Sequence, residues 1–402
     1  MRAYSASAEE AVHARELLKD WAGEDFLTAE QYQRMQQETG CNLRRTNIFL
    51  RLVLFLFTLI IVGAAAALFF VVFLGRPEMR TTGIWLLFFA AICYAATELA
   101  VSRARLYRYG IEEALAACSV GFLCAGIQAV LYSIYHYSIM STGTGSLVPA
   151  AGAIAALWIW HRFGLPYAPL AAMIFVVWLP GYWTSSQPAR HLIVAAIYAA
   201  GLLAVFALRP RHRFTFLNGE YAIAEALLWL GIYVIINLQL SALNLLGDWW
   251  GGVRGTGEFS RPFYWTTWAI TWCLPPVILA RGLRRKDRFV IAAGAIAATL
   301  TLATNKPYLG LERHTWDPML LGILLVGVAF FTRRWLAGAP DGIRRGFTAR
   351  RLSGKDKQRL SAGAATFGLV SPHMITPSPQ AGTPGVKFGG GDSGGAGATS
   401  DF

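Results

Sequence analysis

Residues 52–74 read LVLFLFTLIIVGAAAALFFVVFL, a run without a single charged side chain. Hydrocarbon offers a polypeptide backbone no hydrogen-bond partners, so about 20 consecutive apolar residues indicate a helix that crosses a membrane. Ten apolar stretches of this kind divide the chain. They lie at residues 50–74, 82–101, 112–134, 147–161, 166–183, 191–208, 220–241, 263–280, 289–304 and 317–332. The sequence therefore predicts an all-α fold, a polytopic bundle of about ten transmembrane helices.

The composition favours the same class. Of the 402 residues 55% are hydrophobic and 15% are charged, whereas soluble proteins carry about 25% charged residues. The mean hydropathy is +0.43. The 36 basic and 23 acidic residues leave a net charge of +13, but the cations gather at helix ends, where they set topology and meet anionic lipid headgroups. We therefore expect a lipid bilayer with anionic headgroups as the partner, and no nucleic acid.

The basic residues also predict an orientation. The connections after the second, fourth, sixth and eighth stretches carry three, one, three and five Lys or Arg, and the other connections carry two, none, one, two and two. Cytoplasmic loops are enriched in these residues, so both termini are expected on the cytoplasmic side of the membrane. This orientation requires an even number of spans. Because the uncharged runs of the fourth and tenth stretches (147–160 and 319–331) are short, eight spans remain the alternative to ten.

The chain is expected to have three parts. Residues 1–46 are polar and predict a cytoplasmic helical hairpin, residues 47–335 the transmembrane domain, and residues 336–402 a basic and then Gly-rich disordered cytoplasmic tail. In the hairpin, Gly23 ends a first helix and Thr28 with Gln31 forms a capping box that opens a second. A shared apolar seam is expected from Leu17, Leu18, Trp21, Phe26, Leu27, Tyr32 and Met35.

The hairpin segment LLKDWAGEDFLTAEQY, residues 17–32, resembles a short bacterial module in which a Gly-containing turn and a Leu-Thr-x-Glu-Glu/Gln start join two helices. With a many-span domain following it, the chain resembles an uncharacterised family of predicted multi-pass bacterial membrane proteins, a domain of unknown function. This chain has Phe26-Leu27 where such modules often carry Gly-Leu or Gly-Ile. The resemblance implies no settled activity, but it associates the hairpin with oligomerisation. We therefore expect a cytoplasmic protein partner or self-association through residues 8–46.

Two acids lie inside predicted spans, where a charge is unfavourable and is by default a functional hypothesis. Glu98 lies near the inner end of the second stretch, and Glu225 lies in the seventh. Either serves an ion or proton path, or pairs with an arginine at the membrane interface. Pairing is favoured, because both acids are close enough to a span end to reach such an arginine.

Two polar stripes mark the outer halves of the third and seventh stretches. One consists of Gln128, Tyr132 and Tyr135, followed by His136, and the other of Asn237, Ser241 and Asn244. Residues spaced three and four apart share a helix face. We favour hydrogen bonding between helices, and the alternative is a polar vestibule that opens outward between spans three and seven.

No other chemistry stands out. The chain has no phosphate-binding Gly-rich loop ending in Lys-Ser/Thr, and its seven histidines show no metal-ligand spacing. No catalytic, cofactor-binding or metal-binding residue is predicted. The favoured function is a non-enzymatic membrane scaffold, assembly or regulatory protein. A small-solute permease that uses the vestibule is the alternative, and an intramembrane enzyme ranks third.

Overall fold

The computed structural model describes most of the chain before residue 339 and two short pieces beyond it. The described ranges are residues 2–23, 26–40, 43–74, 78–135, 143–212, 217–240, 259–312, 314–338, 343–344 and 347–348. The chain divides into two compact units, Met1–Arg334 and Trp335–Phe402. The predicted tail, residues 336–402, lies almost entirely outside the described residues, as do His136, Ser241 and Asn244 of the predicted polar stripes.

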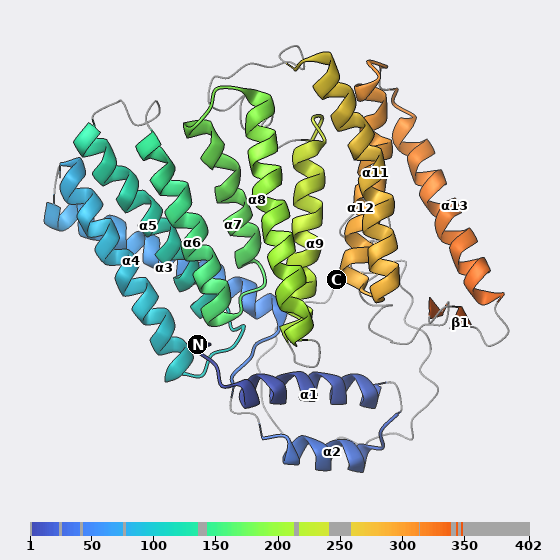
Figure 1. Ribbon diagram of the computed structural model, residues 1–402. Coiled ribbons are helices and arrows are strands. Elements are labelled where there is room, and N and C mark those ends of the chain that lie inside the picture. Colours follow the sequence, from blue (N-terminus) through green and yellow to red (C-terminus); the bar gives the residue numbers. More distant parts are fainter. Residues whose placement is uncertain are drawn as a thin grey trace, which may run out of the picture. The chain divides into compact units, whose positions relative to one another are not determined.

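The N-terminal hairpin forms as the sequence predicts. Helices α1 (Ala6–Gly23) and α2 (Ala29–Glu38) lie side by side across one end of the bundle, which we call the hairpin end (Figure 1). The capping box at Thr28 is confirmed: Thr28 Oγ1 accepts from the N–H of Gln31 at 3.2 Å, and Gln31 Oε1 accepts from the N–H of Thr28 at 3.0 Å. These two bonds satisfy donors that the first turn of a helix leaves free.

A helix occupies each of the ten apolar stretches. The helices are α3 (Ile48–Phe69, continued by the π-helical turn η1, Phe70–Leu74), α4 (Met79–Ser102), α5 (Ile111–Tyr135), α6 (Leu147–Phe163), α7 (Ala168–Trp178), α8 (Gln187–Leu208), α9 (Leu217–Ile236), α11 (Arg261–Arg285), α12 (Arg288–Tyr308) and α13 (Asp317–Ala337). Seven of them are long and apolar enough to cross a membrane: α3, α4, α5, α8, α9, α12 and α13. The described residues of the first unit are therefore all-helical, and the chain is a multi-pass membrane protein.

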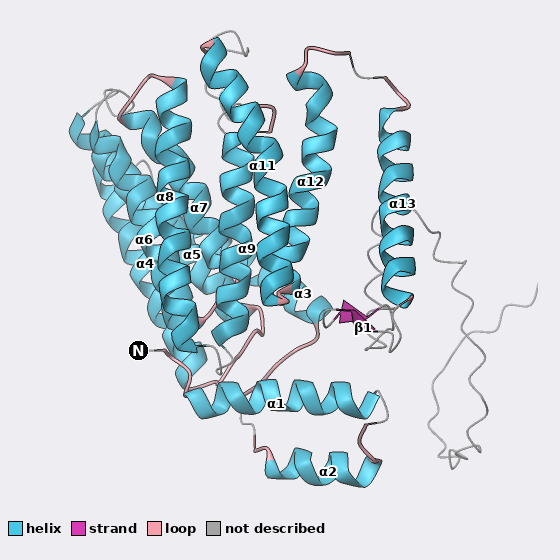
Figure 2. Cartoon of the chain, turned by 45° about the vertical axis from the view of Figure 1, so that its right-hand side comes forward, coloured by secondary structure: helices cyan, strands magenta, loops and turns pink. Residues whose placement is uncertain are grey.

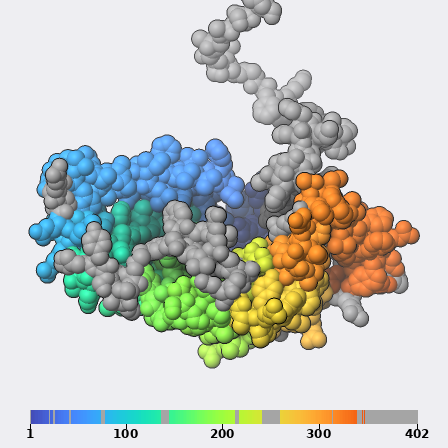
Figure 3. Space-filling view, turned by 90° about the horizontal axis from the view of Figure 1, so that it is seen from above, coloured from blue at the N-terminus to red at the C-terminus, as the bar shows by residue number. Residues whose placement is uncertain are grey.

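The helices pack mainly with their neighbours in sequence. The most extensive pairs are α4 with α5, α11 with α12, α6 with α7 and α8 with α9, and the N-terminal and C-terminal helices of the first unit lie toward opposite sides of it (Figure 3). Glycines allow the α4–α5 approach, since a Cβ at Gly83 would lie 2.9 Å from Val130 N and one at Gly126 would lie 3.0 Å from Gly83 O. Small residues are the usual means of close packing between membrane helices.

Two helices are shorter than a full span. Helix α6 has 17 residues and is about 25 Å long. Helix α7 has 11 residues and is extended by the four-residue 3₁₀ turn η4 (Leu179–Tyr182), which together also reach about 25 Å. The hydrocarbon core of a bilayer is about 30 Å thick. The sequence predicts short fourth and tenth helices; the fourth is short, but the tenth, α13, has 21 residues and meets the criteria for a span.

Helices α3 and α13 contribute little to the interior. Ala66 is the one buried residue of α3, and α13 has none among its described residues. The buried cores lie elsewhere: one joins the hairpin to α4, α5 and α6, a second lies between α7, α8 and α9, and a third between α9, α11 and α12. Figure 2 shows α13 at one side of the bundle.

In the second unit, the described residues form a short antiparallel pair. Strand β1 (Ile343–Arg344) pairs with β2 (Phe347–Thr348). The guanidinium carbon of Arg344 lies 4.6 Å from the centroid of the Trp335 ring, a cation–π contact.

Candidate functional site

Buried charges form a layer at the hairpin end of the bundle. The carboxylates of six residues are less than one tenth exposed there: Glu9, Glu112, Glu113, Glu220, Glu225 and Asp287. Burying a carboxylate is strongly unfavourable unless a cation and hydrogen bonds compensate it. Arginines from other elements supply that compensation for most of these acids, and they tie the helices of the bundle to one another and to the hairpin.

Glu225 on α9 is the centre of the largest cluster. Its side chain is fully buried, and its two oxygens accept from Arg209 Nη1 and Arg281 Nε, both at 2.5 Å. Arg285 Nη1 lies 3.6 Å from the same carboxylate. The 3₁₀ turn η5 (Arg209–His212) places Arg209 after α8, and α11 carries the other two arginines. The cluster therefore links α8, α9 and α11.

Arg209 extends this cluster to α12. Its Nη2 donates to Asp287 Oδ2 at 2.5 Å, and Asp287 Oδ1 caps α12 by accepting from the N–H of Phe289 at 3.0 Å. Arg281 also stacks on Phe206, with 3.5 Å between its guanidinium carbon and the ring centroid. Three guanidinium groups thus meet two carboxylates, which leaves one positive charge. Every hydrogen-bonded member comes from a different element, so the cluster fixes how four helix ends meet.

The first residues of the chain hold α1 against the bundle. Arg2 Nη1 donates to Glu9 Oε1 of α1 at 2.8 Å, and its Nη2 binds Glu220 at the start of α9. The N–H of Ala3 donates to Arg162 O at the end of α6 at 2.8 Å. Burial raises the pKa of Glu9, which shows how far the carboxyl is removed from water. We call this contact the Arg2 clamp.

Two further contacts hold the hairpin, and a third joins α3 to α5 next to it. The segment after α2 pairs with the α4–α5 loop, since the N–H of Arg44 donates to Arg105 O at 2.9 Å. Arg45 Nη2 donates to Glu16 Oε1 on α1 at 2.7 Å. Hydrogen bonds from His13, and then from Arg45, lower the pKa of Glu16 to about 2. Arg51 on α3 binds Glu113 of α5 through both carboxylate oxygens.

The two acids predicted inside the membrane both pair with arginines. Glu98 on α4 accepts from Arg162 Nε at 2.7 Å and Nη2 at 3.0 Å, and from Tyr94 Oη at 3.2 Å. Glu225 pairs as described above. Both lie at the hairpin end, next to the arginines that mark the helix ends. Both carboxylates are thus bound by arginines from other elements.

The described members of the two polar stripes lie on helices that pack with different neighbours. Helix α5 packs mainly on α4, α6 and α3, and α9 packs mainly on α8 and α12. Gln128 and Tyr132 are partly buried on α5, and Tyr135 is exposed at its end. The structure therefore does not bring Gln128 and Asn237 together by direct packing of their helices.

Asn237 forms hydrogen bonds between helices. It is fully buried, and its Nδ2 donates to Tyr233 Oη on α9 at 3.0 Å and to Thr304 Oγ1 on α12 at 2.9 Å. Tyr233 Oη also lies 2.9 Å from Thr301 Oγ1. Asn237 Oδ1 accepts from the N–H of Gln239 at 3.1 Å. These bonds satisfy the amide on both sides, as the favoured interpretation of helix association requires.

The apolar seam of the hairpin is exposed, contrary to the sequence prediction. Leu18 is buried, but four large side chains of the seam remain open: Leu17 (52% exposed), Trp21 (45%), Phe26 (72%) and Met35 (38%). The prediction failed in part because α1 turns one face, with Glu9 and Val12, toward the bundle. Helix α2 has no buried residue.

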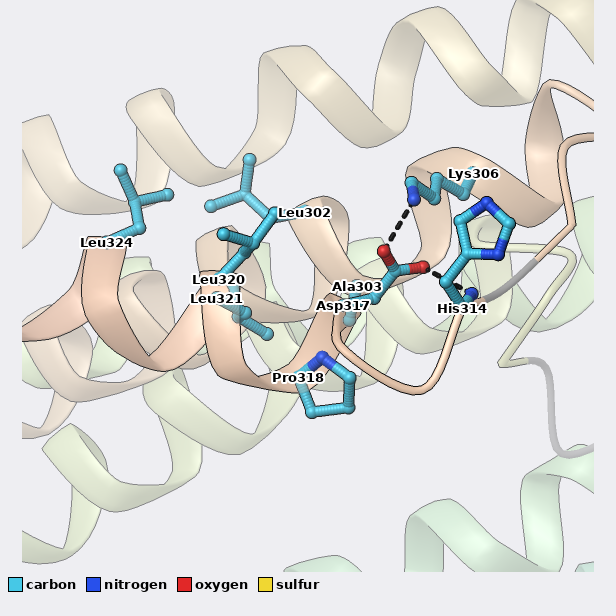
Figure 4. A pocket seen from close by; sticks show the side chains of 9 residues that line it. All are labelled: Leu302, Ala303, Lys306, His314, Asp317, Pro318, Leu320, Leu321 and Leu324. Atoms are coloured by element: carbon cyan, nitrogen blue, oxygen red, sulfur yellow. Dashed lines mark hydrogen bonds and ion pairs between the residues drawn. The ribbon is translucent and has the colours of Figure 1, made fainter.

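A groove lies between α12 and α13 at the end opposite the hairpin (Figure 4). Its volume is about 530 Å³. Lys306 Nζ donates to Asp317 Oδ1 at 2.5 Å across one end of the groove, and the N–H of His314 donates to Asp317 Oδ2 at 3.0 Å. The remaining wall is apolar and consists of Leu302, Ala303, Pro318, Leu320, Leu321 and Leu324.

Comparison with known proteins gives no relative: no family model, no curated protein and no solved structure matches this chain. Within the described part of the chain, no three His, Cys, Asp or Glu side chains are grouped so that they could hold a metal ion. The site must therefore be interpreted from its own residues.

The sequence did not reveal the Arg209–Glu225–Arg281–Asp287 cluster or the Arg2 clamp. The sequence predicted that Glu225 would pair with an arginine near a helix end, but it did not identify which arginines meet it or that Asp287 joins them. The available signal was the placement of Glu220, Glu225 and Asp287 within one or two turns of a helix start, because an acid so close to a membrane interface needs a cation nearby.

Proposed function

We propose that this protein is a non-enzymatic scaffold of the bacterial inner membrane, with both termini and the hairpin in the cytoplasm. The transmembrane bundle would hold the hairpin in a fixed position, and the hairpin would bind protein. In this proposal the protein-binding surface is the α1–α2 hairpin, and the buried ion pairs hold that hairpin in a fixed position on the bundle.

One observation carries the proposal: a hairpin held by ion pairs displays large apolar side chains on its open face. Leu17, Trp21, Phe26 and Met35 belong to this exposed seam, outside every predicted span. In water such a surface is unfavourable, and contiguous apolar patches mark sites of interaction. Aromatic anchors such as Trp21 and Phe26 are typical of protein interfaces.

We propose a second copy of the hairpin as its first partner. The resemblance to modules associated with oligomerisation supports self-association, and the seam offers the same apolar surface to both copies, as a two-fold interface requires. A cytoplasmic protein is the other partner within the scaffold proposal.

Photocrosslinking in intact cells tests the proposal. A photoreactive phenylalanine analogue replaces Phe26, which is 72% exposed, and the control position is Arg34, an exposed polar residue of α2. We expect a crosslinked dimer from position 26, weakened by Trp21→Ser and Leu17→Ser, and much less product from position 34. A discrete crosslinked product with another protein would show that the hairpin binds a cytoplasmic partner rather than a second copy of itself. Equal yields at the two positions, unaffected by the serine variants, would contradict the scaffold.

The permease alternative has less support. It needs a polar vestibule between α5 and α9, but these helices pack with different neighbours, and Asn237 uses its amide within the α9–α12 contact. The two acids inside the predicted spans are also paired with arginines. We therefore do not propose transport.

A further inference from the structure

The groove between α12 and α13 combines a polar end with a long apolar wall. Lys306, His314 and Asp317 lie at one end, and the six apolar residues named above line the rest. Both helices are apolar enough to cross a membrane. In a bilayer the groove therefore opens to lipid rather than to water along most of its length.

The polar end lies at the level expected for lipid headgroups. The ring of Trp316 stacks on His314, with centroids 5.6 Å apart and planes 3° apart, and Lys306 Nζ lies 5.4 Å from the Trp316 centroid. Tryptophan rings of this kind gather at membrane interfaces, with apolar residues on one side and water on the other. Lys306 has three N–H donors, and its hydrogen bond to Asp317 uses one of them.

The lining of the groove limits which molecule can occupy it. Lys306 and His314 lie at one end and leucines line most of the rest, so the groove suits a molecule with one polar and one apolar end. Ordered water requires two to four polar partners for each molecule, and the leucine wall does not provide them. A flexible hydrocarbon chain with a charged headgroup fits this lining.

We propose that this groove binds one phospholipid, with an acyl chain along Leu302, Leu320, Leu321 and Leu324 and the phosphate beside Lys306 and His314. The lipid fills the space that α13, which has no buried side chain, leaves against α12. It acts as the packing partner that joins α13 to the bundle. The groove lies at the opposite end from the hairpin, so this inference is independent of the scaffold proposal.

Native mass spectrometry of the full-length protein in detergent tests the inference. We expect one phosphatidylglycerol to remain bound after repeated detergent washing. Filling the groove by Ala303→Trp or Leu321→Trp should lower the retained fraction at least about tenfold, equivalent to about 1.4 kcal/mol of binding free energy. The matched control is Ile60→Trp on α3, a position 66% exposed to lipid, which should retain the lipid.

Three results would overturn the inference. The first is equal retention in the two groove-filling variants and in Ile60→Trp, provided that all three proteins remain monodisperse. The second is equal retention of phosphatidylglycerol and of a diacylglycerol with the same chains, because the phosphate would then make no contact. A stable dimer that the groove-filling variants dissociate would instead assign the groove to a second copy, and would also reject the lipid.

Discussion

At the scale of single residues, Glu225 is the buried acid whose carboxylate lies closest to several arginines: Arg209, Arg281 and Arg285 are all within 3.6 Å of it. It is fully buried and is bound by Arg209 and Arg281, whose side chains are 10% and 25% exposed. The variant Glu225→Gln keeps the shape but removes the counter-charge of Arg281 and leaves Arg209 with Asp287 alone. Removing one partner of a buried ion pair costs about 3–5 kcal/mol, so we expect a loss of that order in the free energy of unfolding. Titration of the purified protein in mixed micelles with a denaturing detergent measures it.

The matched control is Glu98→Gln. Glu98 and Arg162 are each 26% exposed, so water already screens this pair and its loss should lower the free energy of unfolding much less. An equal or larger effect at Glu98 would contradict the view that burial decides how much each pair contributes.

The same two residues show what the sequence could predict about the site. Position alone indicated that Glu98 and Glu225 would pair with arginines near a helix end, because a charge within a turn or two of the interface can reach one. The partners were beyond prediction: Arg162 lies 64 residues from Glu98, and Arg281 lies 56 residues from Glu225. Such pairings depend on which helices are neighbours, and hydropathy contains no information about that.

At the scale of elements, the hairpin was predicted correctly in its local structure and wrongly in its packing. Thr28 and Gln31 determine where α2 begins through contacts three residues apart, which a sequence displays directly. The apolar positions of α1 can face either α2 or the bundle. Val12 of α1 faces the bundle because Arg2, Ala3 and Tyr4 attach the start of the chain to the bundle. These tertiary contacts, which the local sequence does not display, decide whether a face of α1 packs on the bundle or on α2.

We predict that Arg2→Ala frees α1 from the bundle while the transmembrane helices stay folded. Glu9 and Glu220 would lose their shared cation, and both are buried acids. Amide hydrogen exchange should accelerate across residues 6–23 and remain unchanged in α8 and α12. The control, Arg34→Ala, removes an exposed ion pair of α2 and should leave exchange in α1 unchanged. If α1 stays as protected in Arg2→Ala as in the unmodified protein, the clamp does not hold it.

Acid should loosen the other attachment of α1. The pKa of Glu16 is lowered to about 2 by its hydrogen bonds to His13 and Arg45. A carboxyl whose pKa is lower in the folded protein stabilises the fold at pH values above its unfolded-state pKa, which is near 4.5. This stabilisation is lost as the pH falls from about 4.5 toward 2. Hydrogen exchange in residues 6–23, corrected for its intrinsic pH dependence, should therefore rise over this window, and Glu16→Gln should remove the rise. A rise that persists in Glu16→Gln would assign it to another group.

At the scale of the whole molecule, the ten apolar stretches were predicted closely because hydrophobicity over a window of about 20 residues reports helices directly. Whether each helix crosses the membrane is a separate question. Helix α6 and the α7–η4 segment are each about 25 Å long, so each needs the bilayer to thin slightly around it or its flanking polar groups to reach outward. Ten spans with both termini inside remain our proposal, and it can be tested at the helix ends.

Single cysteines in a protein whose five native cysteines are replaced should report sidedness. Ser186 before α8 and Glu312 before α13 lie at the end opposite the hairpin, and Lys286 between α11 and α12 and Arg334 near the end of α13 lie at the other end of their helices. In intact cells, a membrane-impermeant maleimide should label S186C and E312C but not K286C or R334C, which should react after permeabilisation. Labelling of R334C together with S186C and E312C, but not of K286C, would show that α13 does not cross, and the span count would then be odd. Labelling of K286C and R334C, but not of S186C and E312C, would reverse the orientation and place the hairpin, with its open apolar seam, on the other side of the membrane from the proposed cytoplasmic partner.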